Sequence, residues 1–600
     1  VPRGASVMDG FKIGLVRITR STLASAALVA IVAAMAMAYT SGGGASRESL
    51  IAEMLSNFIL VLGMQVFIGN TGVLSFGHMA FAQIAAYATA VVAIPLAAKT
   101  KALPKIPFGL ESVHYGPMAA TLFAVVVTVV VGAIFGIAVS RASGLAPTMI
   151  TLAALFVVEQ VVKNWKEMTR GAGGLSGIPR LQGNGWLWAG ALLALFVAHF
   201  FQETRIGRFS IATREDELAA PALGIRLFSS RWAAWTVSMG LIALGGSLRA
   251  QSLGSVNPKQ FTLDSGILIL VMLVVGGMRS VSGAVVGTVL ITAGNELFRQ
   301  LGDPQRLGIE RFPDLFLGGT MLLVMVLRPG GLLGDRDLAS WLRRRTYRRP
   351  PPSGETPQQG VSTLVATEIE VRFGGFVALD GAGLTVRPGE VVGLIGPNGA
   401  GKTTLFNVIT GIVDEQGGRV TLGDQDLSDS KPVDIARAGL ARTFQNLRLF
   451  NNLSVRENVA ITALVAARHR SHRVRPDVDT LLDDAGLTDW AGRQAGTLDY
   501  GNQRRLELAR AAALAPDFLL LDEPTSGMSD QESLAMVESV RSVAARVGAG
   551  VLVIDHDLGF ITRISDHIVV LNEGRILAEG TPADVRANPL VAAAYLGSSA

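Results

Sequence analysis

Long runs without a charged side chain dominate the first half of this 600-residue sequence. No Asp, Glu, Lys or Arg occurs between Met54 and Ala98. Further runs of this kind occupy 117–140, 181–202, 232–248, 265–278, 280–295 and 315–327, and an apolar run extends from Leu23 to Ala38. Such runs can cross a hydrocarbon core of about 30 Å, and no soluble core needs this many. We therefore predict an all-α polytopic membrane domain over residues 21–333, with roughly nine to ten spans.

The run from Met54 to Ala98 is too long for one span. It is interrupted by Gly, Asn, Thr and Gly at 69–72, followed by Ser75, Gly77 and His78. Irregular polar backbone at membrane depth is tolerated only where protein buries it or where it lines a cavity. Two interpretations remain open, namely a broken helix near a translocation path and a tight hairpin between two ordinary helices.

The charge pattern argues against a nucleic-acid partner. Lys and Arg gather at the ends of the apolar runs and in an Arg-rich stretch at 343–349. A basic run beside a membrane segment is usually an orientation signal for the cytoplasmic surface, so we expect contact with membrane lipid and no nucleic acid. The chain has no cysteine, which excludes disulfides and thiolate chemistry.

Composition divides the rest of the chain. Residues 1–20 are expected to form an N-terminal cytoplasmic segment ahead of a retained membrane anchor, because no convincing cleavage pattern follows them. Residues 334–360 are rich in Arg and Pro without a periodic apolar face, which is typical of a linker with locally stiff polyproline character. Residues 361–600 have mixed charge and alternating strand and helix signals, which predict a soluble α/β domain.

A complete phosphate-binding loop opens this second domain. The strand-like run Val391–Ile395 leads directly into the loop, which predicts a P-loop between a strand and a helix. Backbone N–H groups of such a loop cradle phosphates, its lysine neutralises their charge and the following hydroxyl reaches Mg²⁺. We therefore expect ATP and Mg²⁺ as ligands. The nucleotide-binding residues are Gly396, Pro397, Asn398, Gly399, Ala400, Gly401, Lys402, Thr403 and Thr404, with Thr403 as the metal-side hydroxyl.

Two carboxylates follow a second buried-strand pattern. The run Phe518–Leu521 ends in Asp522 and Glu523, which is where a P-loop ATPase places its metal-side carboxylate. Asp522 is expected to hold Mg²⁺ through water, and Glu523 is expected to polarise the attacking water as general base.

Three further motifs make this domain resemble ATP-binding-cassette domains. In Thr443–Gln445 the resemblance implies that Gln445 senses Mg²⁺ and the attacking water, and in Ile554–Asp557 it implies that His556 contacts the γ-phosphate. The signature position reads Asp499, Tyr500, Gly501, Asn502 and Gln503.

The signature departs from the common Leu-Ser-Gly-Gly-Gln. Asp499 replaces Ser, Tyr500 replaces the first Gly and Asn502 replaces Gln. The acidic Asp499 should repel a γ-phosphate. Phe373 is expected to stack on adenine, with Phe376 in that role, or plain core packing, as the alternatives.

The first domain resembles the Liv-type permease of branched-chain amino-acid importers. The similarity is carried by 71–78, 174–179 and 327–334 and, at 203–231, by a charged loop that resembles the docking loop of importer permeases. Within that loop Glu217 and Gly224 are the expected coupling residues. Residues 580–585 and 593–597 similarly resemble Liv-type ATPases.

The resemblance implies a permease and an ATP-binding subunit fused in one chain. Its implied activity is ATP-driven import of a small solute, with branched-chain or other apolar amino acids first, urea or short amides as the alternative, and export less favoured. The implied partners are a second permease, a second ATPase subunit and an extracytoplasmic solute-binding protein. The implied location is the bacterial inner membrane, with the ATPase domain in the cytoplasm.

Overall fold

The computed structural model describes residues 26–301, 312–334, 362–470, 473 and 476–596. The predicted segment 1–20 and the predicted linker, apart from Gly334, lie outside these residues. The described chain divides into two compact units. The first unit comprises 26–214 and 228–334, and the second comprises 215–227 and 362–596.

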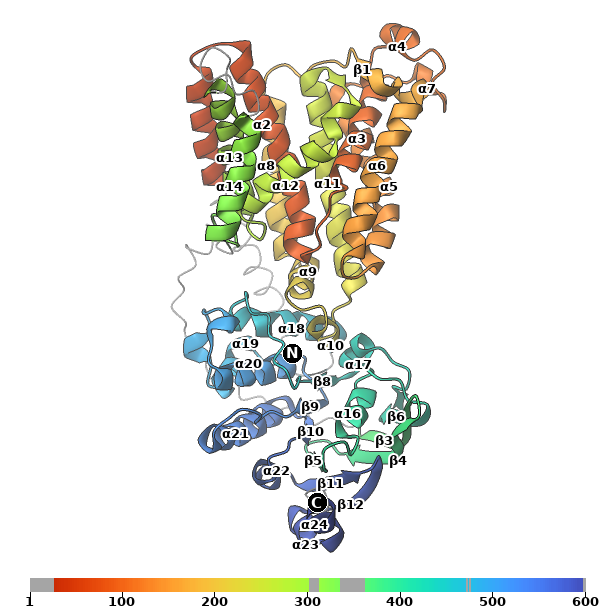
Figure 1. Cartoon of the computed structure of the whole chain (residues 1–600), viewed down its shortest axis with the longest axis vertical. Coiled ribbons are helices and arrows are strands. Elements are labelled where there is room, and N and C mark those ends of the chain that lie inside the picture. The colour runs from red at the N-terminus through yellow and green to blue at the C-terminus, as the bar shows by residue number, and fades with distance from the viewer. Residues whose placement is uncertain (1–25, 302–311, 335–361, 471–472, 474–475, 597–600) are drawn as a thin grey trace, which may run out of the picture. The chain divides into compact units, whose positions relative to one another are not determined.

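The first unit is helical (Figure 1). Its longer helices in chain order are Ala26–Thr40, α2 (Ala45–Met64), α3 (His78–Ala93), α5 (Pro117–Arg141), α6 (Ala146–Asn164), α8 (Gly185–Glu203), α9 (Arg205–Glu215), α11 (Leu227–Leu253), α12 (Leu263–Gly276), α13 (Val281–Leu301) and α14 (Phe312–Leu327). Shorter elements are the π-helix η1 (Gln65–Gly69), α4 (Leu96–Ala102), η2 (Leu110–Ser112), α7 (Lys166–Thr169), η3 (Gly171–Gly173), η4 (Pro258–Phe261) and the antiparallel pair β1 (Leu175–Ser176) and β2 (Ser255–Val256).

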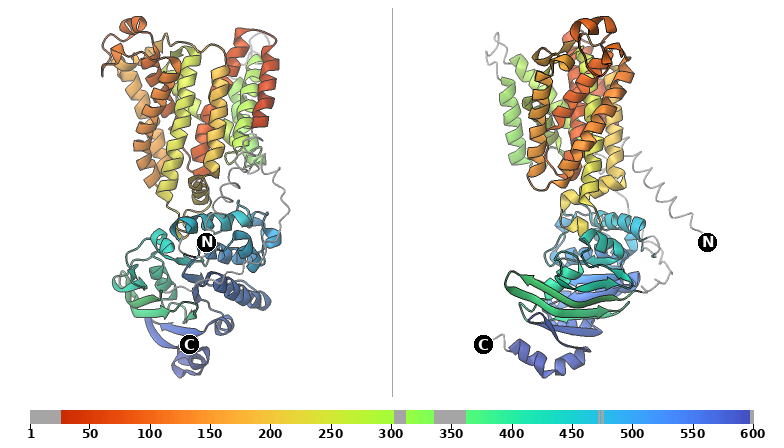
Figure 2. Two further views of the ribbon diagram at one scale, coloured as in Figure 1. Left: turned by 180° about the vertical axis from the view of Figure 1, so that it is seen from behind. Right: turned by 90° about the vertical axis from the view of Figure 1, so that its right-hand side faces the viewer.

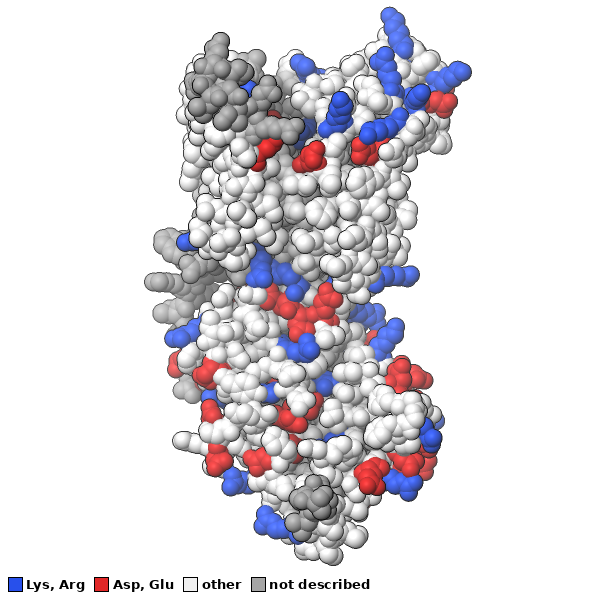
Figure 3. All heavy atoms as spheres, in the orientation of Figure 1, with Lys and Arg blue, Asp and Glu red and all other residues white. Residues whose placement is uncertain are grey.

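The described residues contain fewer long apolar helices than the nine to ten predicted spans. Among the described residues six helices are long and apolar enough to cross a membrane, and a seventh is reached if α3 and α4, bent by 118°, count as one. Two further predicted spans correspond to the shorter apolar helices Ala26–Thr40 and α14, each of which borders residues outside the described ranges. The predicted span 232–248 lies inside α11, where polar side chains such as Ser238 are buried. In Figure 3 the charged side chains of this unit gather at the ends of its helices and leave a pale band between them.

The polar interruption after α2 is covered by other parts of the first unit. The carbonyl oxygen of Gly69 accepts a hydrogen bond from Arg214 at 2.5 Å, and that of Leu74 accepts one from Thr148 at 3.0 Å. The His78 Nε2 lies 3.1 Å from the Ser238 hydroxyl. Most of the break is therefore buried in protein, which is the setting in which irregular backbone is stable at membrane depth, although Gly72 and Leu74 are exposed.

Glycines let α12 and α13 approach each other closely. A Cβ on Gly276 would overlap the carbonyl of Gly283, and a Cβ on Gly287 would overlap the carbonyl oxygen of Met272. Small residues at helix contacts allow this approach, which favours van der Waals packing where lipid gives no hydrophobic drive.

The second unit contains two sheets. The six-stranded sheet has the order β12-β11-β5-β10-β9-β8, and the four-stranded sheet has the order β4-β3-β6-β7. The right-hand view of Figure 2 shows β3 and β4 running side by side. The strands are β3 (Leu364–Phe373), β4 (Phe376–Val386), β5 (Val391–Ile395), β6 (Gly417–Leu422), β7 (Gln425–Asp426), β8 (Leu440–Arg442), β9 (Phe518–Asp522), β10 (Gly550–Ile554), β11 (His567–Asn572) and β12 (Arg575–Gly580).

The second unit also contains helices, most of which connect these strands. They are α10 (Ala219–Ala222), α16 (Lys402–Ile409), α17 (Pro432–Ala438), α18 (Val455–His469), α19 (Val478–Asp484), α20 (Tyr500–Ala512), α21 (Asp530–Val547), α22 (Leu558–Ile564), α23 (Pro582–Ala587) and α24 (Pro589–Leu596), with η5 (Thr488–Trp490) and η6 (Ala495–Thr497). The predicted fold class, an all-α membrane domain followed by an α/β domain, is confirmed.

Parallel pairing brings the predicted motifs to one edge of the six-stranded sheet. Strands β8, β9, β10, β5 and β11 run parallel, so their carboxyl ends meet at the same edge. The loops that leave this edge carry the P-loop, the Asp522–Glu523 pair, Gln445 and His556. An edge of this kind is where open α/β sheets bind ligands.

The close approach of α12 and α13 yields a stability prediction. Gly287→Ala should lower the thermal midpoint of the detergent-solubilised protein, because the added Cβ forces the helices apart at a cost of about 1–3 kcal/mol. Gly318→Ala is the matched control, since a Cβ on that α14 glycine meets nothing within 4 Å. Equal midpoints for the two variants in a thermal-shift assay would contradict the packing described here.

Candidate functional site

The P-loop is built around glycines that no other residue replaces without strain. Gly401 has a φ of 103°, and a Cβ there would lie 2.6 Å from the carbonyl oxygen of Ala378. The Lys402 Nζ donates to the carbonyl oxygens of Gly396 and Pro397 at 2.6 and 2.9 Å, so the ammonium lies inside the loop. Burial lowers the pKa of Lys402, and the charge of Glu523 opposes that shift. The Thr403 side chain is exposed at the start of α16.

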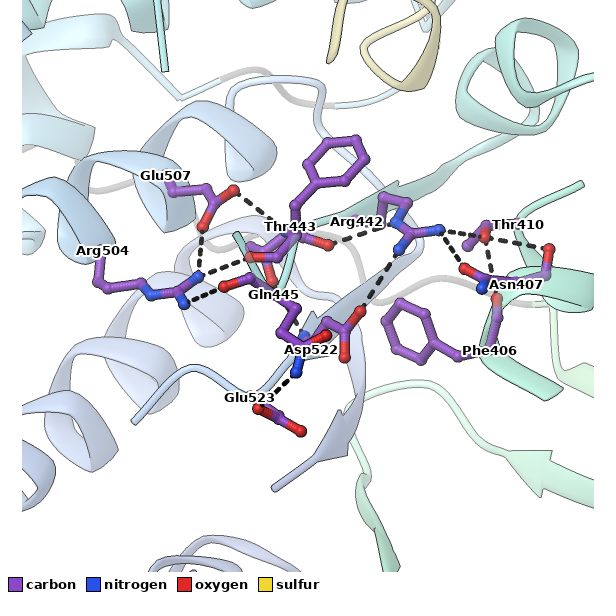
Figure 4. A network of polar contacts seen from close by, with 11 residues as sticks. Phe406, Asn407, Thr410, Arg442, Thr443, Gln445, Arg504, Glu507, Asp522 and Glu523 are labelled. Atoms are coloured by element: carbon purple, nitrogen blue, oxygen red, sulfur yellow. Dashed lines mark hydrogen bonds and ion pairs between the residues drawn. The ribbon is translucent and has the colours of Figure 1, made fainter. Parts of the chain in front are cut away.

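Glu523 and Gln445 are brought together as a pair. The Gln445 Nε2 donates to Glu523 Oε2 at 3.0 Å (Figure 4). Glu523 also has a φ of 47°, a left-handed conformation that costs a non-glycine residue about 1–3 kcal/mol and is concentrated at functional sites. The structure therefore holds the candidate base in a strained position, with one carboxylate oxygen fixed by an amide.

Asp522 lies at the buried end of β9. Burial raises the pKa of its carboxyl, and the nearby Arg442 guanidinium opposes the shift. The ion pair between Arg442 Nη2 and Asp522 Oδ2 measures 3.5 Å.

His556 is on an exposed turn after β10. Its side chain is 67% exposed, and its Nδ1 lies 3.5 Å from Asp555 Oδ1. The buried Asp555 carboxylate accepts hydrogen bonds from the backbone N–H and hydroxyl of Thr525 at 3.1 and 2.6 Å. The imidazole is therefore accessible to solvent. The preceding residue, Asp555, is anchored to Thr525 in the turn that follows Glu523.

The candidate signature residues begin helix α20. The Asp499 carboxylate caps that helix by accepting from Asn502 N and Nδ2, at 2.8 and 2.6 Å, and the backbone bond is the main cause of its lowered pKa. Gly501 is buried and Gln503 is half-buried. The Tyr500 hydroxyl accepts a hydrogen bond from Arg504 at 2.9 Å. A negative charge is thus held at the helix start, and its effect on a γ-phosphate stays a prediction.

Phe373 and Phe376 face each other across the β3–β4 turn. They are 54% and 62% exposed, respectively, so core packing is the least favoured of the three interpretations. Either ring is free to stack on a base.

The donor set fits Mg²⁺. Within the described residues no group of three or more His, Asp or Glu side chains is placed to hold a metal. Mg²⁺ does not need one, because it usually binds through one or two protein oxygens together with waters and substrate phosphates. Thr403, Gln445 and Asp522 offer hard oxygen donors of this kind.

Segment 215–227, here called the docking segment, bonds to the rest of the second unit. Glu215 Oε2 accepts from Asn452 N and Nδ2 at 3.2 and 2.8 Å. Asp216 forms an ion pair of 3.2 Å with Arg448, which follows Gln445 in the chain. These two carboxylates were not singled out from the sequence.

The predicted coupling residues differ in their surroundings. The carbonyl oxygen of Gly224 accepts from Arg437 Nε at 3.0 Å, and a Cβ on Gly224 would lie 2.9 Å from Val465 Cγ1. Glu217 has an exposed side chain. Gly224 therefore lies in direct contact with α17 and α18.

Comparisons with known proteins agree with this architecture. Residues 46–325 match the family described as the permease component of branched-chain amino acid transport systems, 379–526 match ABC transporters, and 575–600 match branched-chain amino acid ATP-binding cassette transporters. The high-affinity branched-chain amino acid transport ATP-binding protein BraF of Pseudomonas aeruginosa is 40% identical over 250 residues, which are 39% of this chain and 98% of BraF. This chain belongs to the branched-chain amino acid family of ABC transporters.

A second relative matches the same share of this chain. The high-affinity branched-chain amino acid transport ATP-binding protein LivG of Escherichia coli (strain K12) is 41% identical over 250 residues, which are 39% of this chain and 98% of LivG. A solved ATP-binding cassette in its ADP conformation is 30% identical, covers 40% of this chain and 100% of its own, and has a TM-score of 0.36. The chain is an ABC transporter that joins a permease and an ATPase, and ATP hydrolysis drives its transport, as the sequence predicted.

Sequence reasoning missed two arginines in this ABC transporter. Arg504 on α20 donates to the carbonyl oxygens of Phe444 and Gln445 at 2.6 and 2.5 Å, and Glu507 accepts from the Phe444 N–H at 3.1 Å. Helix α20 thereby holds the backbone around Gln445. The second arginine that was missed is Arg442, which forms the ion pair with Asp522.

The pair of Gln445 and Glu523 leads to a catalytic prediction. Glu523→Gln should retain ATP binding, since an amide can still bond Gln445, but turnover should fall by a factor of at least about 10² because the proton acceptor is lost. Steady-state ATPase assays of the assembled transporter, with any partner site silenced, measure this. Glu538→Gln, on the exposed face of α21, is the control. Near-normal turnover in Glu523→Gln would remove Glu523 from the role of base.

The position of Gly224 leads to a coupling prediction. Gly224→Ala should lower solute uptake per ATP hydrolysed by about fivefold or more, the low end of typical coupling free energies, because the new methyl group meets Val465. The control is Gly381→Ala, which has the same φ of 78° but meets nothing within 4 Å. Uptake and ATPase rates are measured in liposomes. Equal ratios of uptake to ATP hydrolysis in the two variants would show that the docking segment does not couple ATP hydrolysis to transport.

Proposed function

We propose that this chain is the permease-plus-ATPase half of a heteromeric importer of branched-chain or other apolar amino acids, acting in the bacterial inner membrane. One observation carries the proposal. A branched-chain amino acid permease match and an ATPase 40% identical to BraF occur in the same chain. BraF is itself an ATP-binding protein of high-affinity branched-chain amino acid transport.

The arrangement of the docking segment favours import over export. It runs from the last residue of α9 to the first residue of α11, inside the permease sequence, and packs in the second unit next to Arg448 and Asn452. Both residues closely follow Gln445, so nucleotide-dependent movement of this loop reaches the permease through a short path. ATP-driven closure of a pair of cassettes would be transmitted in this way. Urea or short amides remain the alternative solutes.

The nucleotide site would work with bound Mg²⁺, which neutralises charge on the β- and γ-phosphates. Thr403, Gln445 and Asp522 would hold it, directly or through water, while Lys402 binds the same phosphates. Glu523 would accept the proton of the attacking water at its carboxylate, which Gln445 orients. His556, on its exposed turn, would contact the γ-phosphate.

The signature favours a partner cassette of different sequence. Cassettes act as head-to-tail pairs in which each P-loop is completed by the other chain's signature. A homodimer would place Asp499 beside the γ-phosphate in both sites, where like charges repel strongly because water is scarce. A second cassette with an uncharged signature would complete the site built on Lys402 and Glu523. A second permease and an extracytoplasmic solute-binding protein complete the proposed assembly.

ATPase activity and uptake should both depend on the partner subunits. The chain purified alone should have little ATPase activity and no uptake, and both should return on co-expression with a distinct permease and ATPase and addition of the solute-binding protein. Uptake of radiolabelled leucine, compared with radiolabelled urea and acetamide, then identifies the solute. Robust solute-stimulated hydrolysis by the homodimer would contradict the heteromeric assembly, and uptake of urea without leucine would contradict the solute.

A further inference from the structure

Arg442 is buried between three elements of the second unit. It ends β8 and is 6% exposed. Its Nη1 donates to Thr410 Oγ1 and Asn407 Oδ1, at 2.7 and 3.2 Å, at the end of α16, the helix that follows the P-loop. Its Nη2 faces Asp522 at 3.5 Å. In Figure 4 the guanidinium reaches toward α16 on one side and toward Asp522 on the other.

The Asp522 carboxylate depends on this arginine. Within the described part of the chain, Arg442 is the only residue that forms an ion pair or hydrogen bond with that carboxylate. A buried carboxylate needs such a partner, because an isolated charge is costly in a low-dielectric interior. The position of Arg442 therefore governs the orientation of Asp522.

Aromatic rings extend this arrangement. The Arg442 guanidinium carbon lies over the Phe406 ring at 5.0 Å from its centroid and over the Phe444 ring at 4.8 Å. The guanidinium carbon of Arg448 also lies over the Phe444 ring, at 5.7 Å. Contacts of this type are stronger where water is excluded, as at the buried Arg442, than at exposed sites.

The same series of contacts ends at the docking segment. Arg448 forms an ion pair with Asp216 at 3.2 Å, and both side chains are largely shielded from solvent. The contacts run without a gap from Asp216 through Arg448, Phe444 and Arg442 to Asp522. Gln445 is not part of this series, since its side chain bonds Glu523.

We propose that Arg442 and Phe444 are positioning residues that couple the docking segment to the metal-side carboxylate Asp522, in parallel with the contact between Gln445 and Glu523. A shift of Asp216 moves Arg448 against the Phe444 ring, which moves Arg442 and reorients Asp522. Coupling between two sites is reciprocal, so nucleotide bound with Mg²⁺ acts on the docking segment through the same residues. This inference rests on the proposed function only in treating 215–227 as the transport-linked segment.

Hydrogen exchange on the full chain in nanodiscs tests the proposal without any transport assay. Addition of ATP with Mg²⁺ should change amide exchange across 215–227 in the unmodified protein. In Phe444→Leu, which keeps most of the apolar volume, and in Arg442→Lys, which keeps the charge but loses the planar fork, this response should fall by at least about twofold. The affinity for the fluorescent nucleotide mant-ATP without Mg²⁺ should change less than about threefold in both.

A matched control and a double-mutant cycle separate coupling from lost stability. Arg546 forms a similar two-point ion pair with Asp484, and among the described residues it contacts no aromatic ring. Arg546→Lys removes this pair. It should leave the exchange response intact. The Mg²⁺ concentration at half-maximal mant-ATP binding should change in Asp216→Asn and in Arg442→Lys, and the double variant should deviate from the product of the single changes by at least about twofold.

An unchanged exchange response in Phe444→Leu, additive effects of Asp216→Asn and Arg442→Lys, or no response in the unmodified protein would overturn the proposal. If Arg442→Lys is poorly folded by thermal shift, Arg448→Gln, at a partly exposed position, replaces it in both experiments. Because neither readout uses a solute, failure to import amino acids would contradict the proposed function and leave this inference standing.

Discussion

The second unit depends on three short strands that are buried on both faces. Every residue of β5, β9 and β10 is buried, so these strands have no solvent face on which their register could slip. Each buried Leu, Ile or Val side chain contributes about 1.5–3 kcal/mol relative to an exposed one. This packing fixes where the strands end, and the ends fix the loops. The P-loop, Glu523 and His556 meet because hydrophobic burial, not attraction among polar groups, sets their spacing.

The first unit meets a different constraint, because lipid cannot satisfy backbone polar groups. Its helices bond their own backbone, and the break between α2 and α3 is covered by Arg214 and Thr148. Close glycine contacts, as between Gly276 and Gly283, then replace the hydrophobic drive that packs the sheet of the second unit. One chain therefore uses two kinds of packing, one in each unit.

Sequence reasoning worked where the chemistry is contiguous. The P-loop and the Asp522–Glu523 pair each follow a recognisable strand, so both their type and their position were predictable. Arg442 and Asp216 were not, because Arg442 meets Asp522 across 80 residues and Asp216 meets Arg448 across 232. No local pattern marks such pairs, and a surface charge gives the same sequence signal as a buried one. The number of spans is hard to predict for a related reason, since the absence of charge does not reveal helix length.

One bond of the docking segment, Arg226 with Asp434, joins side chains that are both half or more exposed. Exposed pairs of this kind contribute about 0–1 kcal/mol. Between separate molecules a bond of this kind would be weak. Residues 215–227 are continuous with the permease sequence at both ends, so their bonds to the rest of the second unit form within one chain, at a raised effective concentration. Individually weak bonds of this segment can therefore break and re-form without the ATPase being lost on dilution.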